Sequence, residues 1–127
     1  MKFLSLTEVL EIHHDQVTRS GGTAGIRDIE PLQSALGMRQ ATYRSEFLHS
    51  DVFDIAAAYL FHLVGKHPFL DVNKRVGAAA ALVFLLLNGY DFTAREDDFA
   101  QMVLAAARGE IGKPDVSGFI RRWIQAL

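Results

Sequence analysis

A short stretch near the middle of the chain, at positions 67–75, carries the residue types needed to transfer a phosphoryl group. His67 is suited to be the general base for a hydroxyl nucleophile, because imidazole takes up a proton near neutral pH. Asp71 is suited to Mg²⁺, which commonly takes one or two carboxylates together with phosphate oxygens. Asn73 offers an amide donor, and Lys74 and Arg75 offer two cations for phosphate oxygens. The stretch therefore indicates phosphoryl or nucleotidyl transfer.

Two apolar helices are predicted on either side of this stretch. The first spans about 51–66, with Asp51 opening it, and Pro68 prevents a continuous helix through the motif. The second spans about 73–88 and ends at Asn88-Gly89. It is apolar on all sides, which predicts a buried central helix. Its first turn presents unpaired backbone N–H groups and a partial positive charge, which suit an anion.

The remaining elements are also predicted to be helical, which gives an all-α fold of about six helices. Ser5 and Glu8 form a capping-box pattern for a helix to about Arg19, stopped by Gly21-Gly22. Asp28 is the expected N-cap of a second helix.

Two further predictions concern the last third of the chain. A second capping-box pattern, Thr93 to Glu96, predicts a helix up to Gly109, after a short extended piece at 90–92. Pro114 suits the first turn of a last helix that buries apolar residues as far as Leu127. Arg121 and Arg122 are expected to be a solvated face.

Length and composition bound the class of protein. The chain has 127 residues, half of them hydrophobic, and no cysteine, so residues 1–127 are expected to form a single domain without disulfides or zinc–thiolate sites. The absence of cysteine fits a reducing cytoplasm. An acidic residue, Glu8, comes before any long apolar run, which argues against a signal peptide.

Membranes and nucleic acids are not expected partners. The longest apolar run, 76–87, is well short of the roughly 20 residues that cross a bilayer. The formal net charge is −2, so no general attraction to nucleic acid is expected.

The stretch at 67–75 resembles the signature of the Fic/Doc superfamily, and more narrowly the Doc (death-on-curing) pattern H-x-F-x-D-x-N-K-R. Further matches extend along most of the chain. They are His14-Asp15, Gly21-Gly22, Gly25, Arg27-Asp28, Ser34-Ala35, Phe84-Leu85, Asn88-Gly89 and Ala107-Arg108-Gly109-Glu110.

This resemblance implies a mostly helical Fic fold and the toxin of a bacterial or phage toxin–antitoxin pair. Doc-type enzymes are protein kinases that transfer the γ-phosphate of ATP to a threonine of elongation factor Tu, which halts translation. By this resemblance His67 activates the target hydroxyl, Asp71 is the Mg²⁺ residue, and Asn73, Lys74 and Arg75 hold the phosphates. The implied partner is a Phd-type antitoxin, whose C-terminal segment folds along a groove on the toxin.

Three positions depart from the general Fic pattern H-x-F-x-[D/E]-G-N-G-R-x-x-R. Lys74 replaces the second glycine and fills space for a phosphate, and Ala78 stands where the second arginine would clamp one. Doc shares both changes, so γ-phosphate transfer is favoured over AMP transfer. Val72 replaces the first glycine, and because it is β-branched, that position is expected to have an ordinary backbone conformation.

Two other functions stay open: AMP transfer to a protein hydroxyl, and a non-catalytic Fic-fold module that binds a nucleotide or a partner. From residue types alone, an unremarkable helix start explains the stretch equally well. In that interpretation Asp71 is an N-cap, Lys74 and Arg75 are solvated charges, and His67 is an ordinary loop residue.

Overall fold

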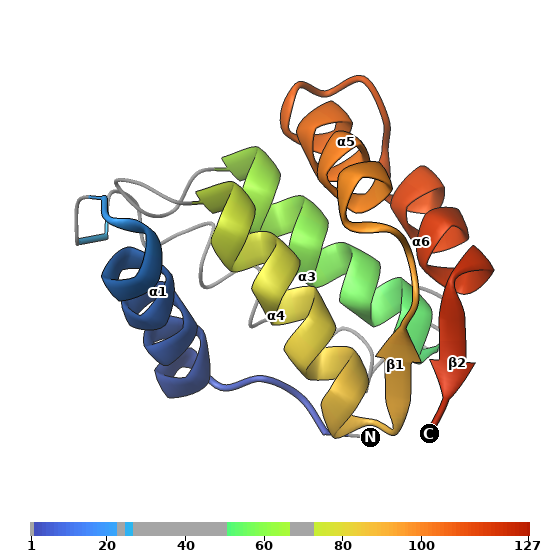
Figure 1. Cartoon of the computed structure of the whole chain (residues 1–127), viewed down its shortest axis with the longest axis horizontal. Helices are drawn as coiled ribbons and strands as arrows, with labels where there is room; N and C mark the ends of the chain where they lie inside the picture. The colour runs from blue at the N-terminus through green and yellow to red at the C-terminus, as the bar shows by residue number, and fades with distance from the viewer. Residues whose placement is uncertain (1, 23–24, 27–50, 67–72) are drawn as a thin grey trace, which may run out of the picture.

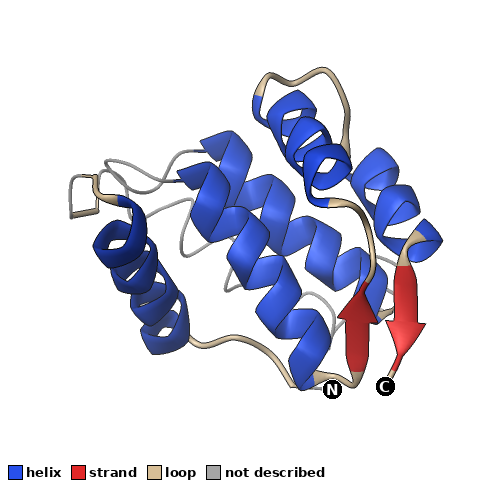
Figure 2. Ribbon diagram, viewed as in Figure 1, coloured by secondary structure: helices blue, strands red, loops and turns tan. Residues whose placement is uncertain are grey.

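The computed structural model describes residues 2–22, 25–26, 51–66 and 73–127, and helices dominate this part of the chain (Figure 1, Figure 2). The predicted all-α class is confirmed, with one small two-stranded sheet in addition. The predicted helix after Asp28 lies outside the described residues. The elements are α1 (Leu6–Ser20), α3 (Val52–Lys66), α4 (Asn73–Leu87), β1 (Tyr90–Phe92), α5 (Glu96–Ala107), α6 (Lys113–Arg122) and β2 (Ile124–Ala126).

Helices α3 and α4 form the centre of the fold. They run side by side in opposite directions, with α1 flanking them on one side and α5 and α6 on the other (Figure 1). One hydrophobic cluster joins the five helices of the described part. Its largest fully buried side chains include Tyr59, Ile55 and Leu60 of α3 and Phe84 and Leu85 of α4. The predicted central helix is therefore confirmed.

The prediction that this central helix is buried on every side was wrong. Three apolar side chains of its C-terminal half are exposed: Val83 by 36%, Leu86 by 52% and Leu87 by 39%. The described helices pack around α4 from behind and from both flanks but leave this outer face uncovered (Figure 1). These three side chains lie on one face of α4, because their positions are one helical turn apart.

The first residues of the helices show which capping patterns in the sequence correctly predicted a helix start. The capping box at Ser5 and Glu8 is present, with both reciprocal hydrogen bonds, and Asp51 accepts from the backbone N–H of Asp54 at 2.9 Å. The predicted capping box at Thr93 was wrong, because α5 begins at Glu96 without a side-chain cap. The Thr93 hydroxyl instead donates to the carbonyl of Trp123 at 2.7 Å.

The C-terminal residues pair with β1 and do not continue the last helix. Helix α6 ends at Arg122, and β2 lies antiparallel to β1 with Asp91 opposite Gln125. The expectation that Leu127 is buried was wrong, because it is 79% exposed. The predicted extended piece at 90–92 is confirmed as β1.

None of the helices in the described ranges is long and apolar enough to span a membrane.

Candidate functional site at the start of helix α4

The predicted site residues divide between described and undescribed parts of the chain. His67 and Asp71 lie outside the described residues. Asn73, Lys74 and Arg75 form the first turn of α4, and they follow the end of α3 after six intervening residues. The Asn73 side chain is buried at 9% exposure, whereas Lys74 and Arg75 are exposed. This first turn therefore combines one buried amide with two exposed cations.

The charge at the start of α4 differs from that of the other described helices. Each of α1, α3, α5 and α6 has at least one acidic residue in its first turn, which is the favourable arrangement for a helix dipole. Helix α4 has none. Lys74 and Arg75 form no ion pair with described residues. Two cations and the positive end of the helix therefore act together, which suits phosphate oxygens.

A metal site cannot be assembled from the described residues alone, because no three histidine, aspartate or glutamate side chains gather among them. A Mg²⁺ ion shared between one carboxylate and substrate phosphates needs no such cluster. Asp71 lies outside the described residues, so the Mg²⁺ site stays a prediction.

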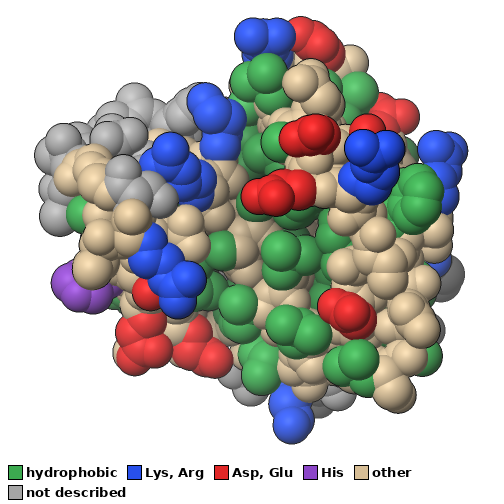
Figure 3. Space-filling view, viewed as in Figure 1, with side chains coloured by type: hydrophobic (Ala, Val, Ile, Leu, Met, Phe, Trp, Pro, Cys, Tyr) green, Lys and Arg blue, Asp and Glu red, His purple; other side chains and the backbone are tan. Residues whose placement is uncertain are grey.

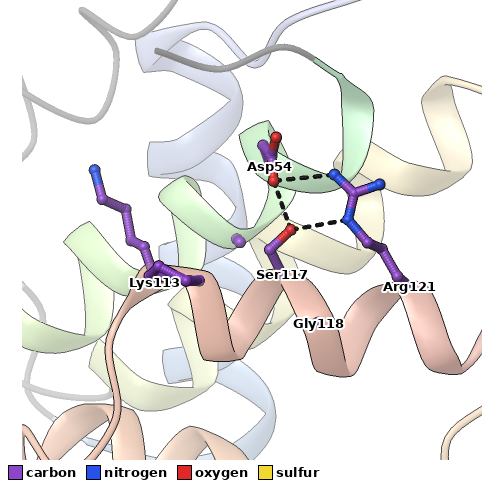
Figure 4. A pocket seen from close by; sticks show the side chains of 7 residues that line it. Asp54, Lys113, Ser117, Gly118 and Arg121 are labelled. Atoms are coloured by element: carbon purple, nitrogen blue, oxygen red, sulfur yellow. Dashed lines mark hydrogen bonds and ion pairs between the residues drawn. The ribbon is translucent and has the colours of Figure 1, made fainter. Parts of the chain in front are cut away.

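A second polar cluster joins the start of α3 to α6 (Figure 4). Arg121 donates to Asp51 at 2.6 Å, to Asp54 at 3.1 Å and to the Ser117 hydroxyl oxygen at 3.3 Å. Ser117 in turn donates to Asp54 at 2.6 Å, and the Arg121 guanidinium lies 5.2 Å from the ring centroid of Phe53. The hydrogen bond to Asp51 raises the pKa of Arg121 above its ordinary value.

This cluster borders a hollow of about 410 Å³ between the two helices. Because Asp54 and Arg121 are already bonded to each other, the polar groups here serve to fasten α6 onto α3. The expectation of a solvated face at Arg121 missed this role, since its two acidic partners lie 67 and 70 residues away in sequence. The hollow is lined by Asp54, Ala57, Lys113, Pro114, Ser117, Gly118 and Arg121.

Comparison with known proteins assigns the family. A model described as the Fic/DOC family matches residues 3–85, which is more than half of the chain. The chain belongs to the Fic/Doc family. The matched range includes all of α1 and α3 and α4 as far as Leu85, and therefore the end of α3 and the start of α4.

Two relatives place the chain more narrowly among Fic/Doc proteins. "Protein kinase doc" of Escherichia phage P1 is 32% identical over 122 residues, which cover 96% of this chain and 95% of the phage protein. "Toxin Doc" of Mycolicibacterium smegmatis is 38% identical over 77 residues, covering 61% of this chain and 59% of that protein. The similarity to the phage protein spans nearly the whole of this Fic/Doc chain, including most of the C-terminal part that the family model leaves unmatched.

Proposed function

We propose that this chain is a Doc-type toxin and a protein kinase, which transfers the γ-phosphate of ATP to a protein hydroxyl. The observation that carries the proposal is the first turn of α4. There Lys74 and Arg75, which form no ion pair with described residues, add two cations to the positive end of a helix that has no acidic residue. The near full-length similarity to a protein named as a kinase supports the same reaction. The proposed target is a threonine of elongation factor Tu, in the cytoplasm.

In the proposed reaction each of the five predicted site residues has one role. His67 removes the proton from the target hydroxyl as its oxygen attacks the γ-phosphorus. The bond between that phosphorus and the oxygen bridging to the β-phosphate breaks, and ADP leaves. Asn73, Lys74 and Arg75 bind the phosphate oxygens and offset their charge. When bound, Mg²⁺ held by Asp71 supplies further neutralisation of the phosphates.

The reaction class can be tested with two labels on ATP. We expect label from the γ-position to reach elongation factor Tu in the presence of Mg²⁺, and intact-mass measurement to show addition of a phosphoryl group. His67→Ala should abolish both the transfer and growth inhibition. Transfer of label from the α-position, with addition of an adenylyl group, would overturn the kinase proposal in favour of AMP transfer. Undiminished growth inhibition by the His67→Ala variant would favour a non-catalytic binding module.

We further propose that a Phd-like antitoxin helix covers the outer face of α4. We call the exposed side chains Val83, Leu86 and Leu87 the apolar band. Figure 3 shows hydrophobic side chains gathered down the middle of this face, over α4, with acidic side chains beside them on the α5 side. Helix α5 carries three exposed acids in its first turn, Glu96, Asp97 and Asp98. An amphipathic helix with basic residues along one edge would complement both features.

The antitoxin contact can be separated from toxicity by one substitution. Leu86→Glu places a charge in the apolar band at a side chain that is already half exposed, so the fold should tolerate it. We expect this variant to inhibit growth even when the antitoxin is co-expressed, and not to co-purify with it. Leu127→Glu is the matched control, because Leu127 is exposed outside the apolar band. Unchanged co-purification of the Leu86→Glu variant would place the antitoxin on another face.

A further inference from the structure

Gly77 differs from the other described glycines within helices in what surrounds it. A Cβ atom built at Gly77 would collide with Cγ2 of Val64 and would lie 3.2 Å from the Leu60 carbonyl oxygen. A Cβ built at Gly65 or Gly118 would meet no atom within 4 Å. Gly77 is therefore the point at which a missing side chain lets α4 lie directly against the backbone of α3.

This close contact lies near both helix ends that border the motif. Gly77 comes four residues after Asn73, which is about 6 Å along α4. Val64 comes two residues before Lys66, the last residue of α3 and the residue before His67 in sequence. A change in the distance between the helices at Gly77 would therefore move the start of α4 relative to the end of α3. Only about one helical turn of α4 lies between Gly77 and Asn73, so little of this shift would be lost along the helix.

We propose that Gly77 is a positioning residue for phosphoryl transfer: its lack of a side chain sets the spacing between the end of α3 and the phosphate-binding turn at Asn73, Lys74 and Arg75. The inference rests on the function proposed above, in which His67, the residue after α3 in sequence, and the first turn of α4 act on one phosphate. Gly77 itself touches no substrate and acts through α3 and α4.

The atoms that an added methyl group at Gly77 would meet cannot easily move aside. The Leu60 carbonyl belongs to the helix backbone, and the Val64 side chain is β-branched, which restricts its rotation within a helix. The helices must therefore move apart. Misplacement of reacting groups by about 1 Å can cost about 100-fold in rate. In contrast, alanine is the better helix former, so the substitution does not weaken α4 locally.

The test compares kcat and KM for ATP in Gly77→Ala, Val64→Ala and the double variant. We expect Gly77→Ala to lower kcat by about 10- to 100-fold, with KM changed much less, while circular dichroism shows a folded protein. Val64→Ala removes the colliding methyl groups, so the double variant should regain most of the lost kcat. Gly118→Ala is the control, because it makes the same change in an open helical position outside the α3–α4 contact.

Each outcome distinguishes positioning from general structure. A wild-type kcat in Gly77→Ala would overturn the inference, as would a folded double variant that stays as slow as Gly77→Ala. If Gly77→Ala does not fold, a folded and active double variant still supports it, and a folded but inactive one overturns it. If the wild-type protein transfers no phosphate, the proposed function fails separately. The same variants are then ranked by growth inhibition, where recovery in the double variant supports positioning and no recovery overturns it.

Discussion

Lys74 and Arg75 are two exposed cations at the helix end where cations are least favourable. We therefore expect Lys74 and Arg75 to contribute to the affinity for a ligand and not to the free energy of unfolding. We expect Lys74→Ala and Arg75→Ala each to weaken binding of ATP with Mg²⁺ by about tenfold or more, because each removes a charge-assisted hydrogen bond. Calorimetric titration measures the affinity, and a thermal melt should show an unchanged or slightly higher Tm.

Lys113→Ala is the matched control for these two variants. Lys113 also lies in the first turn of a helix, α6, and forms no ion pair with described residues. Lys113→Ala lowers the net charge by the same amount as Lys74→Ala or Arg75→Ala, but at a position outside the motif. Equal loss of affinity in Lys113→Ala would mean that overall charge, and not the start of α4, attracts the nucleotide.

Tyr59 provides a second prediction for a single residue. Its buried hydroxyl accepts a hydrogen bond from the backbone N–H of Leu4 at 3.1 Å and so ties the segment before α1 to α3. Tyr59→Phe leaves that buried N–H without this partner, and the free energy of unfolding should fall by about 1–3 kcal/mol. Tyr90→Phe is the control, since the Tyr90 hydroxyl has no hydrogen bond to described residues, and its denaturant midpoint should stay near that of wild type. Equal effects from the two variants would contradict this assignment.

At the scale of elements, the first and last residues of a helix were predictable where they depend on residues close in sequence. The Ser5 capping box, the Asp51 cap and the stop after α4 depend on residues within one helical turn of each other. The end of α6 could not be predicted in this way. The strand β2 that follows α6 depends on pairing between residues more than thirty positions apart. Next to this pairing, the Thr93 hydroxyl donates to the Trp123 carbonyl and does not cap α5.

The attachment of α6 to α3 is a testable property of two elements. Arg121→Met should lower the free energy of unfolding by about 1–2 kcal/mol, because it removes charge-assisted hydrogen bonds that are only partly shielded from solvent. Arg122→Met, at an exposed neighbour that has no ion pair with described residues, should change it little. Urea denaturation measures both, and equal losses would mean that the cluster contributes no more than a general surface charge.

The pH dependence of the Arg121 contribution has a definite sign. The hydrogen bond to Asp51 raises the pKa of Arg121, so its contribution is complete below the ordinary arginine pKa and falls only as pH rises through the raised value. The difference between wild type and Arg121→Met should therefore be the same at roughly pH 7 and pH 9.

At the scale of the whole molecule, the sequence predicted where the central helix begins better than which of its faces is exposed, and the roles of the site residues stay predictions. The residue types at 67–75 and the family pattern pointed to the start of α4, and Asn73, Lys74 and Arg75 lie there. The exposed outer face of α4 could not be predicted, because an all-apolar helix carries no sign of which face its neighbours leave open. That residues 1–127 form a single domain stays a prediction, and the one hydrophobic cluster of the described part agrees with it.

The turn after α4 holds both outer segments of the described chain. Asn88 accepts from the backbone N–H of Lys2 at 2.8 Å and donates to its carbonyl at 2.9 Å, while the N–H of Leu127 donates to the Gly89 carbonyl at 2.9 Å. The N and C labels of Figure 1 lie close together as a result. Asn73, Lys74 and Arg75 lie at the opposite end of α4, about 22 Å away for a helix of 15 residues.

This arrangement makes the molecule suitable for circular permutation. A short glycine-rich linker from Leu127 to Lys2, with new ends cut at the exposed pair Gly109-Glu110, should leave the core and the start of α4 undisturbed. We expect the permuted chain to keep its helical circular dichroism and its affinity for ATP. Tags or surface anchors at residues 2 and 127 would likewise lie at the opposite end of α4 from Asn73, Lys74 and Arg75, so immobilisation through either residue should leave the proposed nucleotide-binding turn accessible.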